Sequence, residues 1–347
     1  MIEEVKDYIK ELGIEIFAII KPLDFSFRKD YLIRWISSRF HGEMDYMARN
    51  LEKRLSPEKL YPEVKSILIV GIPYDTLRWN DIDKKGRGLI SKYAIRRDYH
   101  RVIKKKLKKI LSFLREKNSE IQGRIYVDSA PVLEKELARL AGIGFIGKNT
   151  MLISKKFGSY FFLGELFLNI ELEEIKHPPV PLLCASCKRC VEACPSEAIV
   201  KPYILDASRC ISYLTIEYRG IIKDDLENQM GQWIFGCDEC QEVCPFNRKN
   251  KPLEVSLIPD EKRLANIKLE ELILLRKEDF EEIFKGTPVK RAGYEMFMRN
   301  VFIAAGNSGK KELLQSLRKR EKDFLQNPIV YHHLLRAIKK LENNRSE

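Results

Sequence analysis

The stretch Cys184-Ala185-Ser186-Cys187-Lys188-Arg189-Cys190-Val191-Glu192-Ala193-Cys194-Pro195 decides how the middle of this chain folds. Its C-x2-C-x2-C-x3-C-P spacing is that of a protein with two iron–sulfur clusters, in which the fourth cysteine ligates the other cluster. Four more cysteines follow, first Cys210 alone and then a C-x2-C-x3-C-P run at Cys237, Cys240 and Cys244. All eight cysteines of the chain therefore lie within 61 residues. Two sets of four thiolates indicate a pair of 4Fe–4S clusters, and hence electron transfer.

The crossover of the fourth cysteine predicts which thiolates share a cluster. Cys184, Cys187, Cys190 and Cys244 form one predicted set, and Cys194, Cys210, Cys237 and Cys240 form the other. Residues 211–236 are then an insertion beside the second cluster. Two zinc sites of four thiolates each are one alternative, because C-x2-C pairs also bind zinc. A disulfide framework is the other, and it requires an export signal that the N-terminus does not show.

The composition predicts a cytoplasmic protein with an anionic partner. The chain has 347 residues, a net charge of +12 and an isoelectric point near 9.1. Basic residues concentrate in two segments: residues 91–120 hold eleven lysines and arginines against three acids, and residues 285–347 hold fourteen against six. Two basic faces suit a folded nucleic acid, although a solvated helix face explains each segment equally well. No segment is apolar over the length of a membrane span, so we expect no membrane association.

The pattern of apolar residues predicts a mixed α+β and α/β chain in three parts. Residues 1–175 contain apolar runs typical of buried strands, alternating with helical patterns such as the basic segment Tyr99–Lys117. Residues 176–255 form the cysteine-rich, loop-rich part, and residues 256–347 read as short paired helices similar to HEAT repeats. The predicted strands are Ile14–Ile20, Ser66–Ile72 and Gly123–Val127, and a further predicted helix is Phe27–Arg39.

Asp128 is the candidate catalytic residue outside the cysteines. It follows a predicted strand, at the end where sheets of this class bind ligands. The alternative is an N-cap for a helix over Val132–Leu140. Gly142, Gly144 and Gly147 then spell G-x-G-x-x-G, but a helix precedes them where a dinucleotide site requires a strand. We therefore interpret these glycines as a tight backbone loop against a large flat ligand.

Four stretches carry a resemblance to a known family. They are Val127–Leu166 (VDSAPVLEKELARLAGIGFIGKNTMLISKKFGSYFFLGEL), His41–Arg49 (HGEMDYMAR), Tyr93–His100 (YAIRRDYH) and Arg299–Asn307 (RNVFIAAGN). Together with the cysteine pattern, including the isolated Cys210, they resemble the epoxyqueuosine reductases, which are relatives of the reductive dehalogenases. The resemblance covers nearly the whole chain.

The resemblance implies a fold and an activity. It implies a nitroreductase-like domain that binds cobalamin, a ferredoxin-like domain with two 4Fe–4S clusters, and C-terminal HEAT-like helices. It also implies the last step of queuosine biosynthesis, in which epoxyqueuosine at the wobble position of a tRNA anticodon is reduced to queuosine. Asp128 would donate the proton, with a raised pKa beside the apolar cofactor. Predicted cobalamin contacts, besides Asp128, are Arg54, Tyr93, Asn149, Leu152, Leu163 and Ser212.

Further predictions concern the cobalt, the partners and the alternatives. Asp98-Tyr99-His100 lacks the glycine of a D-x-H-x-x-G motif, since Ile103 stands in its place, so cobalt should receive no axial histidine from it. We expect the cations of Arg101–Lys109, with Lys290, Arg291 and Arg299, to contact tRNA phosphates. A separate electron donor and a monomeric state are also expected. A dehalogenase-like reductase of a small molecule and a non-catalytic iron–sulfur electron carrier remain as alternative functions.

Overall fold

A four-stranded sheet organises the N-terminal part of the chain in the computed structural model, which describes residues 2–74, 86–248, 264 and 267–343. Its strand order is β1-β2-β7-β4, and every neighbouring pair is antiparallel. The strands are β1 (Ile16–Ile20), β2 (Ser66–Pro73), β7 (Phe161–Leu168) and β4 (Gly123–Tyr126). The three predicted strands are thus confirmed, whereas the sequence analysis did not identify β7, which lies between β2 and β4.

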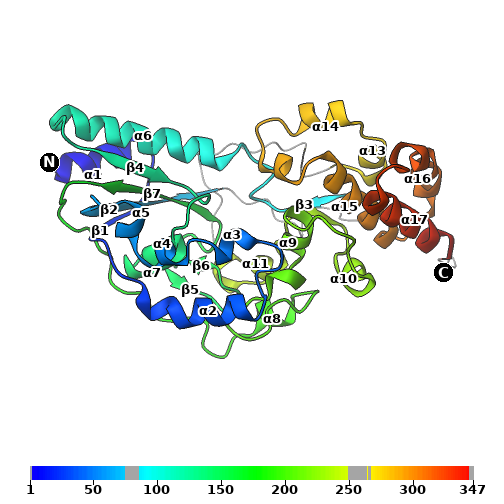
Figure 1. The fold of residues 1–347 in the computed structure, drawn as a ribbon, viewed down its shortest axis with the longest axis horizontal. Helices are drawn as coiled ribbons and strands as arrows, with labels where there is room; N and C mark the ends of the chain where they lie inside the picture. Colours follow the sequence, from blue (N-terminus) through cyan, green and yellow to red (C-terminus); the bar gives the residue numbers. More distant parts are fainter. Residues whose placement is uncertain (1, 75–85, 249–263, 265–266, 344–347) are drawn as a thin grey trace.

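Helices cover both faces of this sheet, as the alternation of side chains along a strand requires. Leu68, Val70 and Ile72 of β2 point to one face and pack with α1 (Ile2–Glu11) and α6 (Tyr99–Lys117). Ile67 and Ile69 point to the other face, where further helices pack. Figure 1 shows α1 and α6 together along one side of the sheet. The helices on the other side are α2 (Lys29–Ser37), α4 (Leu51–Leu55), α5 (Pro57–Leu60) and α7 (Glu134–Leu140), and the short helix α3 (Asp45–Ala48) precedes α4 in the chain.

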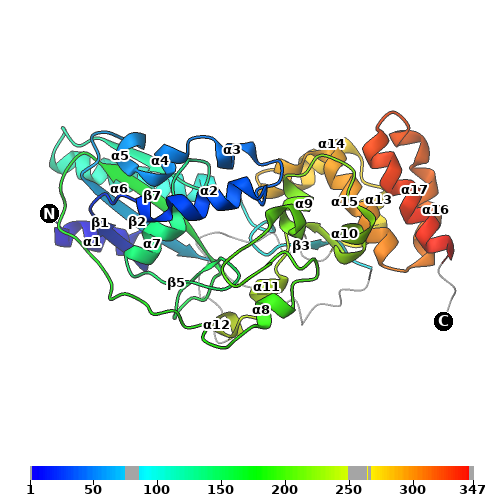
Figure 2. The same cartoon turned by 60° about the horizontal axis from the view of Figure 1, so that its bottom comes forward.

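The cysteine-rich part consists of loops and very short helices, as predicted. Its elements are α8 (Arg189–Glu192), η3 (Ala207–Arg209), α9 (Ile211–Ile216), α10 (Asp224–Gln229), β8 (Trp233–Phe235), α11 (Glu239–Glu242) and α12 (Pro245–Arg248). In Figure 2, α8, α11 and α12 lie together below the sheet. Strand β8 pairs in parallel with β3 (Leu89–Ile90), which comes from the N-terminal part of the chain. A hairpin of β5 (Phe145–Ile146) and β6 (Leu152–Ile153) packs against the cysteine-rich part, where Phe145 lies near Cys244.

The C-terminal part is helical and lies at the opposite end of the molecule from the N-terminus (Figures 1 and 2). Its elements are α13 (Leu269–Ile273), α14 (Lys277–Ile283), η5 (Pro288–Ala292), α15 (Tyr294–Asn307), η6 (Lys311–Leu313), α16 (Leu314–Lys319), η7 (Glu321–Phe324) and α17 (Pro328–Asn343). Helices α15 and α17 pack closely at Gly306, where a Cβ would lie 2.9 Å from the Cα of Ala337. Ile90, Ala94 and Ile95 pack into the core of these helices.

The predicted three-part division stays a prediction. Its second boundary, between residues 255 and 256, lies outside the described residues. The segment from Ile90 to Ile95 belongs to the first predicted part by sequence but packs with the third. No helix within the described ranges combines the length and the apolar character needed to cross a membrane.

Candidate active site

Asp128 lies two residues beyond the end of β4, in a segment that leads into α7. Its backbone has φ of 58°, which is unusual for a residue with a side chain. Helix α7 begins at Glu134 and its N-cap position, Leu133, makes no side-chain capping bond. The alternative role of Asp128 as the N-cap of this helix is therefore wrong. Its side chain is 51% exposed and available to a ligand.

Two side chains from the start of α6 reach the Asp128 carboxylate. The Tyr99 hydroxyl donates a hydrogen bond to Asp128 Oδ2 at 2.9 Å, and His100 Nε2 lies 3.4 Å from the same oxygen. His100 Nδ1 lies 2.8 Å from Asp98 Oδ1. Asp98 also accepts the His100 backbone N–H, so it is the N-cap of α6. One imidazole therefore bridges two carboxylates, and we call Asp98, His100 and Asp128 the carboxylate–imidazole relay.

The relay places its proton on the imidazole. The hydrogen bond from His100 lowers the pKa of Asp128, burial opposes this effect, and the hydrogen bond from Tyr99 reinforces it. Burial lowers the pKa of His100, but the hydrogen bonds and charges of Asp128 and Asp98 outweigh burial and raise this pKa to about 9. The two donors from α6 thus lower the Asp128 pKa in the described structure, opposite in direction to the rise expected beside the apolar cofactor, which stays a prediction.

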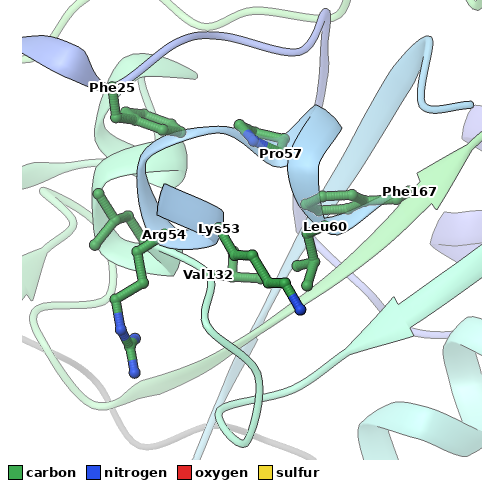
Figure 3. Close-up of a pocket in the computed structure, with 8 residues that line it drawn as sticks. Phe25, Lys53, Arg54, Pro57, Leu60, Val132 and Phe167 are labelled. Atoms are coloured by element: carbon green, nitrogen blue, oxygen red, sulfur yellow. The ribbon is translucent and has the colours of Figure 1, made fainter. Parts of the chain in front are cut away.

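Arg54 and Tyr93, two predicted cobalamin contacts, lie in the same neighbourhood. Arg54 on α4 is buried, donates to the Tyr46 carbonyl at 2.9 Å, and has no partner for its Nε. Figure 3 shows its guanidinium pointing away from the apolar residues that line a hollow beside α4 and α5, which has no room for a water molecule. The Tyr93 ring contacts the rings of Tyr99 and Phe235, with centroids 6.4 and 6.2 Å apart. The unpaired Nε fits a ligand with an acceptor oxygen, but the hollow is too small for a corrin.

The other predicted cofactor contacts lie between the sheet and the cysteine-rich part. Asn149 is buried and donates to the Cys240 carbonyl at 3.3 Å. The neighbouring Lys148 donates to the carbonyls of Ala185 and Cys187 at 2.6 and 2.8 Å. Leu163 on β7 and Leu152 on β6 pack in the apolar core on the α7 side of the sheet. Ser212 is partly exposed in the first turn of α9, two residues after Cys210.

The glycine-rich loop packs against the chain itself. A Cβ on Gly142 would lie 2.2 Å from the His177 carbonyl oxygen, and one on Gly144 would lie 2.5 Å from the Ile153 carbonyl oxygen. The tight backbone loop is thus confirmed for these two glycines. The atoms that exclude a Cβ at these two positions belong to neighbouring backbone, and contact of the loop with a large flat ligand stays a prediction.

The cysteines gather in two groups. All eight are free thiols, which contradicts the disulfide alternative. Burial raises the pKa of the Cys190 thiol, and its neighbours Cys184, Cys244 and Cys187 raise this pKa further. Burial likewise raises the pKa of Cys237, and here Cys210 and Cys240 are the neighbouring thiols. The charge of Cys194 raises the pKa of both Cys210 and Cys240. Within the described ranges, no three His, Cys, Asp or Glu side chains converge as ligands of a single metal ion.

Comparisons with known proteins identify the family. Residues 54–129 match the family described as epoxyqueuosine reductase QueG, DUF1730, and residues 183–247 match the 4Fe-4S double cluster binding domain. The epoxyqueuosine reductase of Pseudomonas aeruginosa is 38% identical over 346 residues, covering 97% of this chain and 94% of the relative. This chain belongs to the epoxyqueuosine reductase family. It is therefore an oxidoreductase, and it carries an iron–sulfur domain.

Other members of the epoxyqueuosine reductase family agree in sequence and in fold. The Escherichia coli epoxyqueuosine reductase is 36% identical over 97% of this chain and 88% of its own length. The Streptococcus thermophilus structure has a TM-score of 0.89, with 27% identity over all of this chain and 92% of that one. An epoxyqueuosine reductase solved with a tRNA-Tyr epoxyqueuosine-modified stem loop has a TM-score of 0.83, with 27% identity and 98% coverage of both chains.

The cations that we expected to contact tRNA differ in their surroundings. Arg101, Lys105, Lys108 and Lys109 are exposed on α6, whereas Lys106 donates to the Leu12 carbonyl at 2.6 Å. Lys290 pairs with Glu281, and Arg291 lies 2.8 Å from Glu217. The charge of Arg291 also lowers the pKa of Asp128, so Arg291, in η5, lies near the relay.

The prediction for Arg299 is wrong. Its side chain is fully buried in α15 and donates to the carbonyls of Leu214, Tyr218 and Gly220 at 2.5–3.0 Å. Asn300 next to it donates to the carbonyls of Thr215 and Ile234 at 2.8 and 3.0 Å. We call Arg299 and Asn300 the α15 brace, because they hold the segment after Cys210 and the strand before Cys237. A buried arginine that binds backbone carbonyls cannot contact a phosphate.

The sequence analysis did not assign roles to Tyr99, His100, Glu134 and Glu165. Tyr99 and His100 lie within the YAIRRDYH stretch, and their position directly after an N-cap aspartate could have indicated that they share one end of α6. Glu165 carries a weaker signal, a lone acid within the apolar run FFLGELFL. Glu134 carries no local signal, since an acid in the first turn of a helix is common.

Proposed function

We propose that this chain reduces epoxyqueuosine to queuosine at the wobble position of tRNA anticodons, as the last step of queuosine biosynthesis. It would use cobalamin and two 4Fe–4S clusters, with Asp128 as the proton donor. The observation that carries this proposal is the carboxylate–imidazole relay beside Tyr99 and Arg291, in a chain that also contains a double-cluster domain. The tRNA complex of a structurally similar enzyme supports the substrate.

The proposed cluster ligands follow the two groups of cysteines. Cys184, Cys187, Cys190 and Cys244 would hold one cluster, and Cys194, Cys210, Cys237 and Cys240 would hold the other. Support comes from the charges that neighbouring thiols exert on one another. Cys184 and Cys187 raise the pKa of Cys244, and Cys194 raises the pKa of Cys210. The charge of Cys190 raises the pKa of Cys240, which belongs to the other set. This proximity of the two sets suits electron transfer from one cluster to the next.

The proposed cobalamin site lies between the nitroreductase-like sheet domain and the ferredoxin-like part. The residues present fit such a cofactor: Arg54 offers an unpaired buried N–H, Asn149 contacts the backbone at Cys240, and Leu152 and Leu163 are apolar. When bound, cobalamin supplies a strongly reducing cobalt centre that can deliver electrons to an epoxide carbon. Tyr93 and Ser212 would complete the contacts, and the HEAT-like C-terminal helices would contribute to tRNA binding.

The chain's own residues would supply the protons. Conversion of an epoxide to an alkene consumes two electrons and two protons and releases water. Asp128 would pass to the epoxide oxygen the proton that His100 Nε2, 3.4 Å away, carries, and reprotonation of His100 from water would supply the second proton. The Tyr99 hydroxyl holds the carboxylate in place. Because the His100 pKa is about 9, its imidazole carries a proton at neutral pH.

Anaerobic reconstitution tests the proposal. The protein is loaded with iron, sulfide and cobalamin, its metals are measured, and it is assayed on an epoxyqueuosine-containing anticodon stem loop with a chemical reductant. About eight irons and one cobalt per chain, with queuosine formed, are expected. Metal uptake without turnover on this RNA, but with turnover on a haloaromatic compound, would favour a small-molecule reductase. Iron uptake without any cobalt would favour an electron carrier.

A further inference from the structure

The backbone at Asp128 needs an external restraint. A φ of 58° places it in the left-handed region, where a residue with a Cβ is disfavoured. Local hydrogen bonds shape the segment, since the Ser129 N–H donates to the Val127 carbonyl at 2.6 Å and the Val132 N–H donates to the Ala130 carbonyl at 2.8 Å. Neither bond involves the Asp128 amide. The conformation of Asp128 therefore depends on what that amide contacts.

The Asp128 amide donates to Glu134 Oε1 at 2.6 Å. Glu134 is the first residue of α7, and this helix is firmly anchored: Leu137 and Ala138 are fully buried, and Glu136 pairs with Arg28 and Arg139. The acceptor is thus fixed to a rigid element. An amide at Asp128 that rotates out of the left-handed conformation would lose this acceptor.

A fully buried carboxyl lies beside the partly exposed Glu134. Glu165 of β7 is fully buried, in register with Tyr126 of β4 and Ile69 of β2. Burial raises its pKa, and the charge of Glu134, the hydrogen bond with the Glu134 carboxyl and the charge of Asp128 raise it further. The surroundings of Glu165 therefore favour its neutral form, because burial and neighbouring carboxylates both disfavour its charge.

The groups around Glu134 favour a carboxyl that still accepts a hydrogen bond. Burial and the charge of Asp128 raise its pKa, whereas the Asp128 amide, the Glu165 carboxyl and the charge of His100 lower it. The Lys135 ammonium interacts with the charge of Glu134, and it also donates a hydrogen bond to the Thr150 carbonyl at 2.9 Å. A carboxyl has an acceptor oxygen in both protonation states, so the bond to the Asp128 amide does not require full ionisation.

We propose that Glu134 is the positioning residue of Asp128: its carboxyl holds the Asp128 amide, so that the Asp128 side chain stays turned toward Tyr99 and His100. Glu165 supports Glu134 from the interior of the sheet. The inference rests on the proposed role of Asp128 as the proton donor. It assigns to α7 a function that the relay residues, which lie after the end of β4 and at the start of α6, do not supply.

Two variants of the full-length, cluster-loaded protein test the inference. Glu134→Ala removes the acceptor, and Glu134→Gln keeps an acceptor oxygen without the charge. For Glu134→Ala we expect amide hydrogen exchange in residues 127–133 to accelerate at least about tenfold, and kcat to fall about 100-fold with KM within about twofold. Glu134→Gln should restore most of kcat and the slow exchange. Wild-type exchange in Glu134→Ala, or a Glu134→Gln variant as impaired as Glu134→Ala, would overturn the inference.

A double variant separates this inference from the proposed function. If Glu134 acts through Asp128, then Glu134→Ala adds no further loss of kcat to Asp128→Asn. An additive loss would overturn the positioning role. If Asp128→Asn alone keeps wild-type kcat, the proton-donor assignment fails, and exchange in residues 127–133 then still reports whether Glu134 holds the segment.

Discussion

The carboxylate–imidazole relay and the α15 brace are both dense hydrogen-bond networks, but their partners differ. The relay joins ionisable side chains to one another, and its Asp128 carboxylate is half exposed. The brace joins a fully buried guanidinium and amide to backbone carbonyls. Side chains that share protons can perform chemistry, whereas side chains that bind carbonyls fix the path of the backbone. The identity of the acceptors therefore distinguishes the proposed catalytic network from a structural one.

Removal of the brace should have the largest effect. Arg299→Met leaves the buried carbonyl of Leu214 and the part-buried carbonyls of Tyr218 and Gly220 without their donor, and each buried group of this kind costs about 1–3 kcal/mol. We expect the free energy of unfolding to fall by about 3–5 kcal/mol, measured by urea denaturation. Iron content should fall as well. Arg219→Met is the matched control, because exposed Arg219 also donates to two carbonyls, those of Ala292 and Arg291. An equal loss of unfolding free energy in both variants would contradict the structural role given to the brace.

A substitution in the relay should lower the activity and leave the stability unchanged. Asp128→Asn should lower kcat about 10²–10⁴-fold, since it removes a general acid. Iron and cobalt content and the unfolding midpoint should match the wild type. The measurement is single-turnover reduction of the stem loop, and Asp7→Asn on the exposed face of α1 serves as the control. Full turnover by Asp128→Asn would remove this residue from the mechanism.

The pH dependence should sharpen the role of His100. Its pKa is raised to about 9 in the folded chain, so its proton, and the stability which that proton contributes, are present below its ordinary pKa of 6.5 and lost as the pH rises through about 9. We expect kcat to decline over the same range. His100→Gln should lower kcat about tenfold or more at pH 7 and abolish this alkaline decline. An unchanged pH profile in His100→Gln would assign the decline to another group.

The exposed cations of α6 should give the smallest effect. Lys105→Glu combined with Lys108→Glu should weaken stem-loop binding several-fold and reduce its salt dependence, with kcat unchanged, because phosphate contacts position the substrate. Lys156→Glu, an exposed lysine paired with Glu15, is the control. Equal binding and equal salt slopes in the two proteins would exclude α6 from the RNA contact surface.

Local sequence patterns predicted those elements whose signals are themselves local. The predicted limits of α6, Tyr99–Lys117, agree with the structure because its apolar period and its N-cap lie within one segment. Strand β7 was not predicted, since Gly164 and Glu165 interrupt its apolar run. Arg299 was misinterpreted for a related reason: a cation in a helix is usually exposed, and the carbonyls that bury it lie 79–85 residues away.

The relay shows the same limit. Asp128 was identified, but its partners Tyr99 and His100 lie on another element, and only the packing of α6 on the sheet brings them together. The direction of the Asp128 pKa shift depended on those partners. The position of the aspartate could thus be predicted from its own segment, whereas its chemistry could not.

The α15 brace sets an order of events during synthesis. Residues 210–237 leave the ribosome before Arg299 and Asn300, so this segment, with Cys210 and Cys237 at its ends, has no brace until about sixty further residues have been made. At about 5–20 residues per second this interval lasts several seconds. During it, four thiols of the proposed second cluster are present without the helix that fixes their backbone. We expect nascent chains that end before residue 299 to take up the first cluster in preference to the second.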